Sequence, residues 1–236
     1  MYEFLKNKRI MIIVAHPDDE LLGLGGTLNK LINDYSVETH LVILGEGITS
    51  RSDSRDINLW KKELEIHQSN IKKAQLAIGY HSLSLYHFPD NRFDSVDLLD
   101  LIKVIEKEKK YFNPSVIFTH HGGDLNIDHQ KTFEAVMTSC RPINSEVVKT
   151  IITFETPSGT EWRASSDPKH FLPNLYFQIS TENLEAKIKG MESYEFESRD
   201  YPHPRSPEAL RIYAQKNGIN VGVPYAEAFC LIRQIN

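Results

Sequence analysis

The sequence predicts an α/β protein in which a mostly parallel sheet lies between two layers of helices. Two observations predict it. Short apolar runs rich in isoleucine and valine alternate with amphipathic helical segments, and that succession builds parallel sheets covered on both faces. The chain has 236 residues, 40% hydrophobic and 25% charged, which suits one large globular domain. We therefore expect residues 1–236 to form a single domain, with a core over about 8–140 and a C-terminal part, about 141–236, that covers the substrate.

The N-terminal part alternates strand and helix in a regular order. Lys8–Ala15 is a continuous apolar run, typical of a strand buried on both faces. Glu20–Tyr35 carries leucines at helical spacing, and Asn58–Ile78 is amphipathic and ends before Gly79, a residue suited to a helix C-cap. The same alternation predicts strands over Ser36–Leu44, Leu83–Phe88 and Ser115–His120, a polar loop over Gly45–Asp56, and helices over Asp94–Tyr111 and Asp128–Thr138.

The last third of the chain is less regular. Tyr201–Pro207 is rich in proline and predicts a loop, because proline lacks the amide hydrogen that regular structure requires. Pro207 suits the first turn of a helix, which we expect to run through about Lys216. The other expected elements are strands over Val147–Glu155 and Leu175–Ser180, a helix over Glu182–Glu192, and a strand or edge segment over Ala226–Ile235.

Charge and cysteine content exclude several classes of protein. The net charge of −5 argues against sequence-independent binding of nucleic acid, which needs a basic stripe. Cys140 and Cys230 lie far apart and match no metal or disulfide pattern, so we interpret them as buried residues of a reducing compartment. No apolar run suits a secretory signal or a membrane span. We expect a cytoplasmic protein without stable membrane insertion, and the sequence leaves open a homo-oligomer.

The segment from His16 to Glu20 carries the sharpest local signal for chemistry. It follows a predicted buried strand and precedes a helix, and ligands of open α/β sheets bind at the carboxyl ends of strands. The spacing allows His16 and Asp19 to turn toward one point, with Asp18 beside it. Such groups are costly to bury unless they are hydrogen-bonded, paired or bound to a metal. The alternative is that these residues only cap the start of the helix.

A second polar cluster, His120–His129, follows another predicted strand. Because that strand belongs to the same parallel sheet, both clusters are expected at the same edge. Asp128 and His129, at the start of the next helix, can supply a third ligand. A His/Asp/His set leaves one coordination position open, as catalytic zinc sites do. The alternative is a solvated loop with a capping aspartate.

Three segments together, His16–Glu20, Gly23–Thr27 and Asp128–His129, resemble the PIG-L/LmbE-like zinc-dependent de-N-acetylases. Members of that family remove the acetyl group from N-acetylglucosamine units carried on various aglycones. The resemblance spans nearly the whole chain and implies a three-layer, Rossmann-like α/β/α fold. Weaker matches lie in Gly45–Arg51, Phe88–Asn91, Glu155–Trp162 and Gly222–Phe229.

The resemblance implies a role for each residue of the two clusters. His16, Asp19 and His129 would bind the metal, which is zinc or another divalent ion such as iron or cobalt. Asp18 would be the general base and would return its proton to the leaving amine. Many family members have a histidine three positions before the second ligand histidine, where this chain has Asn126. Asparagine can donate a hydrogen bond to an oxyanion, but it cannot deliver a proton.

Two histidines, His121 and His203, are the candidates for the role that Asn126 cannot fill, either as an acid or as substrate-binding groups. Asp128 is expected to orient a ligand histidine through its second ring nitrogen. The other histidines have no partner pattern and are interpreted as surface or structural residues: His40, His67, His81, His87 and His170.

Several side chains are candidates for binding the substrate. Arg51 and Arg55 follow the second strand and either face solvent or bind an anionic group or sugar hydroxyl. Trp162 and Tyr225 either stack on a sugar ring or pack in the core or an interface, and packing is favoured for Trp162. The resemblance adds Glu46 and Asp90 as contacts to sugar hydroxyls.

The glycines of Gly23–Gly26 do not indicate a dinucleotide site. A dinucleotide fingerprint places glycine in the turn from strand to helix, where this chain has acidic residues that repel phosphate. We expect these glycines inside the helix, where they permit close packing on the sheet. The sequence thus predicts a metal-dependent hydrolase that removes the N-acetyl group of a small sugar or sugar conjugate. Its alternatives are a metallohydrolase of another acylated amine and a non-catalytic sugar-binding protein.

Overall fold

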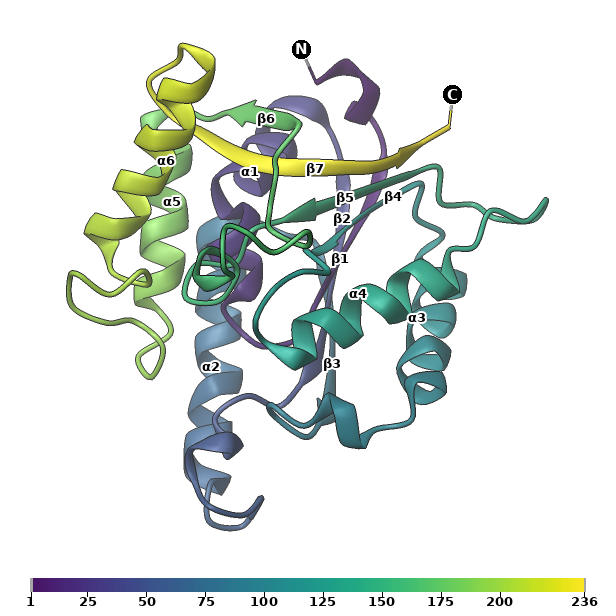
Figure 1. Cartoon of the computed structure of the whole chain (residues 1–236), viewed down its shortest axis with the longest axis vertical. Coiled ribbons are helices and arrows are strands. Elements are labelled where there is room, and N and C mark those ends of the chain that lie inside the picture. The colour runs from purple at the N-terminus through teal and green to yellow at the C-terminus, as the bar shows by residue number, and fades with distance from the viewer. Residues whose placement is uncertain (1, 236) are drawn as a thin grey trace.

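The computed structural model describes residues 2–235, and its centre is a seven-stranded sheet in the order β3-β2-β1-β4-β5-β7-β6 (Figure 1). Strands β1 to β5 are parallel, and β7 runs antiparallel to both of its neighbours. The predicted mostly parallel sheet is therefore confirmed. The strands are β1 (Arg9–Val14), β2 (Glu38–Gly45), β3 (Ser82–Phe88), β4 (Val116–His120), β5 (Thr150–Phe154), β6 (Leu175–Gln178) and β7 (Ala226–Gln234).

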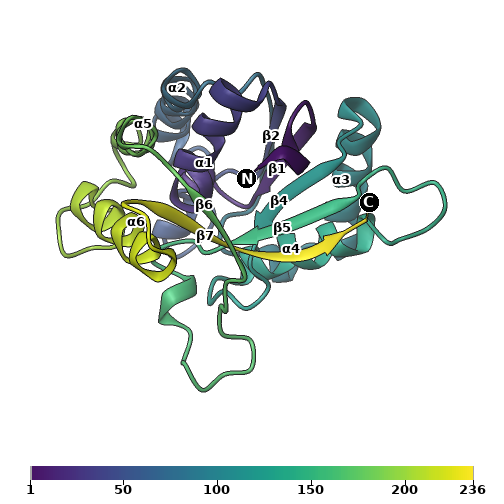
Figure 2. The same ribbon diagram turned by 90° about the horizontal axis from the view of Figure 1, so that it is seen from above.

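Helices cover both faces of the sheet, which gives the predicted three layers. Helices α1, α2, α5 and α6 pack together on one face, and α3 and α4 pack together on the other (Figure 2). Short 3₁₀ turns lie at Glu3–Leu5, Thr49–Arg51, Phe93–Ser95 and Thr160–Trp162. The helices are α1 (Asp19–Tyr35), α2 (Lys61–Ile78), α3 (Leu98–Phe112), α4 (Ile127–Ser139), α5 (Thr181–Glu192) and α6 (Pro207–Val221).

Strand β1 shows why this sequence builds a sheet buried on both faces. Successive side chains of a strand point to opposite faces. Ile10 and Ile12 belong to the core beneath α1 and α2, whereas Met11 and Ile13 belong to the core beneath α3 and α4. All four are fully buried. The uninterrupted apolar run of β1 thus supplies both cores of the protein.

Several element boundaries differ from the prediction. Helix α2 begins at Lys61 rather than Asn58, because the Asp56 carboxylate accepts hydrogen bonds from the Asn58 and Leu59 amides and holds a turn there. Helix α3 begins at Leu98, after a separate 3₁₀ turn.

The C-terminal elements differ as well. Helix α6 runs five residues further than predicted, to Val221, and ends at Gly222 with φ +74°. Strand β7 is an inner strand between β5 and β6 and not an edge. The predicted C-cap at Gly79 is confirmed, with φ +95°.

Helix α1 packs unusually close to the sheet and is broken once. A Cβ atom at Gly23 would lie 2.2 Å from the Phe154 ring of β5, which confirms that this glycine permits close packing. The next residue, Leu24, has a non-helical φ of −146°. Beyond that break, the buried Glu227 accepts hydrogen bonds from the amides of Gly26 and Thr27. No helix within residues 2–235 has the length and apolar character that crossing a membrane requires.

Candidate metal and catalytic site

Four segments meet at the carboxyl edge of the sheet. His16, Asp18 and Asp19 follow β1. His120 ends β4, which pairs directly with β1, and the residues up to His129 follow it. Asp90 follows β3, and a C-terminal segment around Arg205 reaches the same place. The two clusters were predicted to lie at one edge of the sheet, and they do lie together there.

His16, Asp19 and His129 bring three possible metal-binding atoms to one point. Asp19 Oδ2 lies 3.5 Å from His16 Nδ1 and 3.4 Å from His129 Nε2. Zinc bonds of about 2.0–2.1 Å in tetrahedral geometry place neighbouring ligand atoms roughly 3.4 Å apart. All three residues offer ligand atoms that lie within 4.8 Å of one another. The spacing and chemistry of this donor set therefore fit a zinc ion.

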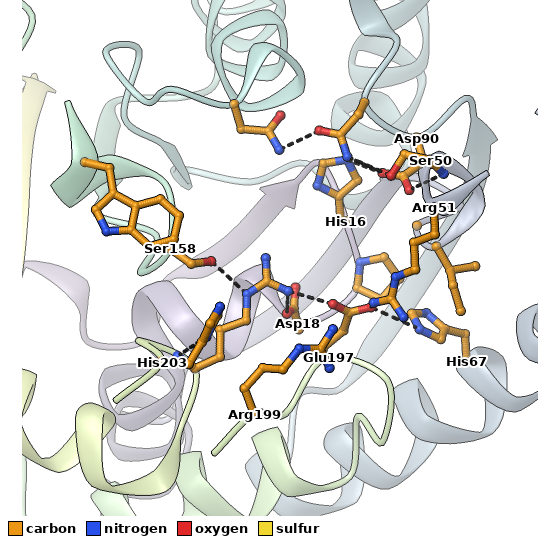
Figure 3. A pocket seen from close by; sticks show the side chains of 17 residues that line it. His16, Asp18, Ser50, Arg51, His67, Asp90, Ser158, Glu197, Arg199 and His203 are labelled. Carbon is orange, nitrogen blue, oxygen red and sulfur yellow. Dashed lines mark hydrogen bonds and ion pairs between the residues drawn. The ribbon is translucent and has the colours of Figure 1, made fainter. Parts of the chain in front are cut away.

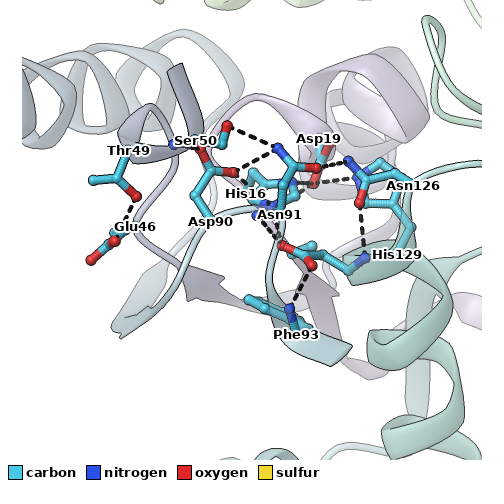
Figure 4. A network of polar contacts seen from close by, with 12 residues as sticks. His16, Asp19, Glu46, Thr49, Ser50, Asp90, Asn91, Phe93, Asn126 and His129 are labelled. Carbon is cyan, nitrogen blue, oxygen red and sulfur yellow. Dashed lines mark hydrogen bonds and ion pairs between the residues drawn. The ribbon is translucent and has the colours of Figure 1, made fainter. Parts of the chain in front are cut away.

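A carboxylate contacts the second ring nitrogen of each ligand histidine, His16 and His129. Asp128 Oδ2 lies 2.9 Å from His16 Nε2, and Asp124 Oδ2 lies 3.2 Å from His129 Nδ1. Each contact orients the imidazole so that its other nitrogen faces Asp19, as carboxylates commonly do behind metal-binding histidines. Asp128 therefore makes the contact with His16 that the sequence predicted for it. Figure 4 shows His16, Asp19 and His129 close together.

A second group, His16, Asp90 and Asp128, also lies within metal-binding distance. Its oxygens are already engaged by amide hydrogens. Asp128 accepts from the amides of Asn91 at 2.7 Å and Phe93 at 2.8 Å, and Asp90 accepts from the amide of Ser50 at 3.0 Å. Asp19 Oδ2 likewise accepts the amide of His16, so the donors themselves separate the two sets. The set that contains Asp19 offers two imidazoles, whereas the second set offers only His16 Nε2, which Asp128 already holds at 2.9 Å. Because zinc binds imidazole well, the set that contains Asp19 is the better fit.

The histidines differ in charge according to their neighbours. Burial alone would lower the pKa of His129, but the Asp19 and Asp124 carboxylates outweigh it and raise this pKa to about 9. His120, which stacks on His129 with ring centroids 3.9 Å apart, has its pKa lowered to about 4, chiefly by burial. His120 Nε2 accepts the Ala15 amide at 2.9 Å, so His120 holds the two strand ends together.

Asp18 lies beside the donor set in a strained backbone conformation. Its φ of +100° is in a region that non-glycine residues rarely occupy, and its side chain is 2% exposed. The Asp18 side chain makes no cap hydrogen bond, and the Asp19 carboxylate accepts the amide of His16. The cap interpretation of these carboxylates is therefore wrong. Burial, reinforced by Asp19, raises the pKa of Asp18 well above its usual range, although Arg205 opposes the shift.

Arg205 connects Asp18 to a network that the sequence did not predict. Its Nη1 donates to Asp18 Oδ2 at 3.1 Å and to Glu197 Oε2 at 2.6 Å, and its Nε donates to Ser158 Oγ at 2.8 Å. Arg51 donates to the other oxygen of Glu197 at 2.5 Å. Glu197 thus joins Arg51 to Arg205. Figure 3 shows Glu197 between Asp18 and Arg51.

These residues line a polar cavity of about 330 Å³. His67, interpreted from the sequence as a surface or structural residue, is 2% exposed and also lines it, 3.6 Å from Glu197. Trp162 lies on the cavity wall and is 57% exposed. The prediction that Trp162 packs in the core is therefore wrong. The cavity contains seven residues that the sequence singled out: His16, Asp18, Arg51, Asp90, Asn126, Trp162 and His203.

Asn126 is fixed at the N-terminus of α4. Its Oδ1 accepts the amide of Asp128 at 2.8 Å, so Asn126 is the cap of this helix. Its Nδ2 donates to Asn91 Oδ1 at 2.9 Å. His203 lies across the cavity, and its Nδ1 accepts the Arg205 amide at 3.2 Å. Burial and the nearby Arg205 lower the pKa of His203.

Four predicted substrate-binding residues lie outside the lining of this cavity. Glu46 and Arg55 form a bidentate ion pair with each other, at 2.8 and 3.0 Å. The ring of His121 contacts the Lys169 carbonyl at 2.9 Å, and Tyr225 packs against the core beneath α1. The structure does not bring these side chains to the site.

The PIG-L family, described as GlcNAc-PI de-N-acetylase, matches residues 11–140, which are 130 of the 236 residues. The chain belongs to this family. Two curated relatives are each 26% identical to it. One is the uncharacterized deacetylase YaiS of Escherichia coli, covering 80% of this chain and 91% of the relative, and the other is a probable N-acetyl-alpha-D-glucosaminyl L-malate deacetylase 2 of Bacillus anthracis, covering 90% and 83%.

Solved structures share the fold at low sequence identity. The N,N'-diacetylchitobiose deacetylase of Pyrococcus horikoshii matches with a TM-score of 0.74 and 20% identity, over 99% of this chain and 86% of that one. The 4-carboxy-2-hydroxymuconate hydratase GalB of Pseudomonas putida matches with a TM-score of 0.68 and 17% identity, over 97% and 98%. Because a deacetylase and a hydratase share this fold, the chemistry must be argued from the site.

Proposed function

We propose that this chain is a metal-dependent hydrolase that removes the N-acetyl group from an N-acetylglucosamine-type sugar or sugar conjugate. The observation that carries the proposal is the set of His16, Asp19 and His129 at metal-binding spacing, with Asp18 beside it at one side of a polar cavity. Membership of the PIG-L family and the names of the curated deacetylases support the same chemistry.

Zinc bound to the three residues would lower the pKa of a water molecule and polarise the acetamide carbonyl. Asp18 then takes the proton of the attacking water, because its carboxylate lies in the cavity next to the donor set. The same carboxyl group delivers that proton to the nitrogen that leaves as the free amine. Arg205 holds Asp18 through one oxygen and so fixes the direction of the carboxylate.

Asn126 is placed to stabilise the oxyanion of the tetrahedral intermediate. Capping of α4 through Oδ1 fixes its amide, and the Nδ2 group carries two hydrogens, of which one is directed to Asn91. The second N–H is the donor that we assign to the oxyanion. One well-placed donor of this kind is worth about 10²–10³ in kcat.

The sugar itself is bound by the polar wall of the cavity in this proposal. Asp90 and Arg51 offer a carboxylate and a guanidinium to hydroxyl groups, and Trp162 offers an exposed ring for stacking. His203 contributes a neutral imidazole, since its pKa is lowered. Glu46, Arg55, His121 and Tyr225 have no direct part in binding the sugar, because they lie outside the lining of this cavity.

The test measures bound metal and acetate release in matched variants. We expect about one divalent ion per chain, lost in His129→Ala and retained in Asp18→Asn. Both variants should lose acetate release from N-acetylglucosamine conjugates by at least about 10³-fold, in line with the loss of a catalytic group. His81→Ala and Asp34→Asn, at exposed positions away from the site, are the controls and should retain both metal and activity.

Other outcomes separate the alternatives. Loss of metal in Asp18→Asn would mean that Asp18 is itself a ligand. Acetate or another acid released from acylated amino acids, but not from acetylated sugars, would identify a different amide substrate. Tight sugar binding without acetate release by the metal-loaded protein would identify a non-catalytic binding protein. Wild-type protein without a divalent ion and with unchanged activity in His129→Ala would refute the proposal.

A further inference from the structure

A second cavity adjoins the catalytic pocket, and we propose that it binds an apolar alkyl aglycone of the same substrate molecule. This inference rests on the proposed function. The cavity has a volume of about 390 Å³ and lies between α2 and the ends of β2 and β3. Pro17 and His67 line both cavities, so the two spaces share a wall.

Most of the lining of this second cavity is apolar, and its one buried carboxylate, Glu46, is already paired with Arg55. Ile43 of β2 and Ile71 of α2 are both almost fully buried, and Leu64 and Leu85 add two half-buried aliphatic side chains. The catalytic pocket, by contrast, is lined mostly by charged and polar groups. Sugar hydroxyls would lose hydrogen bonds to water against such a wall, whereas an alkyl chain gains by leaving water.

The mouth of the second cavity exposes an apolar side chain to solvent. Ile57, just before α2, is 46% exposed and lines the cavity. Lys61 and Glu65, on the first turns of α2, also line it and are polar. A chain that entered between them would cover Ile57 and leave the charged groups in water. The mouth therefore suits an amphiphile whose polar end lies elsewhere.

The shared wall shows where that polar end lies. Pro17 is the neighbour of Asp18, and it stands with His67 at the boundary between the two cavities. His67 stacks on Phe196 with nearly parallel rings, and within the described residues neither ring nitrogen has a hydrogen-bond partner. In this proposal, a sugar held beside Asp18 extends its substituent past Pro17 into the apolar cavity.

The volume and the lining of the cavity determine how much an alkyl chain should strengthen binding. A cavity of this size falls in the usual range of small-molecule sites, about 300–1,000 Å³. Each buried methylene strengthens binding about fourfold. An octyl glycoside has seven methylenes more than a methyl glycoside, and the burial of two of them already gives roughly a sixteenfold gain. Because the chain contacts are equal in the ground and transition states, the gain belongs in KM and not in kcat.

The experiment compares the methyl and octyl β-glycosides of N-acetylglucosamine below their micelle concentrations. We expect the octyl glycoside to have a KM at least about tenfold lower at equal kcat. Leu64→Gln should remove most of that ratio and leave the kinetics of the methyl glycoside unchanged, because Leu64 does not line the catalytic pocket. The matched control is Leu76→Gln, the same change on α2 at a side chain that is 85% exposed.

A binding measurement keeps the inference separate from the proposed function. Octyl glucoside has no acetamide, so its binding can be measured by calorimetry without turnover, and that binding should weaken in Leu64→Gln. Ile57→Asn, at the exposed mouth, replaces Leu64→Gln if that variant does not fold. Deacetylation of neither glycoside, with octyl glucoside still bound, would refute the proposed function only. Equal KM for both glycosides, preferred binding of octanoate over octyl glucoside, or octyl binding unaffected by both variants would overturn this inference.

Discussion

A buried ion pair holds the break in helix α1, and its removal tests how the site-bearing end of that helix is supported. Lys187 of α5 donates to the Leu22 carbonyl at 2.9 Å and to Glu227 Oε1 at 2.6 Å. Both members of the pair are almost fully buried. The turn that carries Asp18 and Asp19 lies directly before this part of α1.

Lys187→Met keeps the length of the side chain and removes its charge and donors. Loss of one partner from a buried pair costs about 3–5 kcal/mol. Glu227 retains two backbone amide donors, which places the cost at the lower end, and the unpaired Leu22 carbonyl adds roughly 1 kcal/mol. We therefore expect the free energy of unfolding to fall by about 3–4 kcal/mol, measured by urea denaturation with circular dichroism.

Two further variants make this prediction specific. Lys189→Met, an exposed position on the same helix, should change stability by less than about 0.5 kcal/mol. Adding Glu227→Gln to Lys187→Met should recover part of the loss, because the uncompensated charge is then gone. A loss below about 1 kcal/mol in Lys187→Met, or no recovery in the double variant, would refute the reasoning.

Three other predictions concern packing, pH and the cavity wall. Gly23→Ala should lower the free energy of unfolding by about 1–3 kcal/mol in urea denaturation, because the new Cβ meets the Phe154 ring, and unchanged stability would contradict the close approach. Burial alone would raise the pKa of Glu108, but hydrogen bonds from Tyr86 and two neighbours lower it. The Glu108 carboxylate therefore stabilises the fold above its unfolded pKa of about 4.3, and this contribution is lost as pH falls through the lower folded pKa. The stability difference between wild type and Glu108→Gln should accordingly shrink below about pH 4.3. A difference that grows there would mean that folding raises the pKa of Glu108 instead of lowering it. Trp162→Ala should raise KM for an N-acetylated sugar while the free energy of unfolding changes by less than about 0.5 kcal/mol, because the ring is 57% exposed, and a large loss of stability would show a packing role instead.

The candidate metal ligands could be found from the sequence because each cluster follows a strand of one parallel sheet. The apolar run before His16 and the run before His120 identify those strands, and parallel neighbours end at a common edge. The strain at Asp18 could not be found, because backbone torsion is set by the surrounding packing. The limits of α2 and α3 were missed where side chains such as Asp56 bind backbone amides and end the helical pattern.

The network around Asp18 could not be predicted because its members come from distant parts of the chain. Arg205 lies 187 residues after Asp18, and Glu197 is an ordinary acidic residue in its local sequence. The one available signal was the proline-rich loop, in which Arg205 stands two residues after His203. Glu46 and Arg55 were predicted to bind the substrate, but the structure places them elsewhere. Their opposite charges, nine residues apart in the sequence, pair with each other, and neither side chain lines the catalytic cavity.

The most direct test of the central claim is acetate release from an N-acetylglucosamine conjugate by chelator-treated protein as zinc is added back. If His16, Asp19 and His129 hold a catalytic metal, the treated protein is inactive and its turnover returns as zinc approaches one equivalent per chain. His129→Ala should show no return at that ratio. Full turnover by the metal-free protein, or equal recovery in His129→Ala, would contradict the claim.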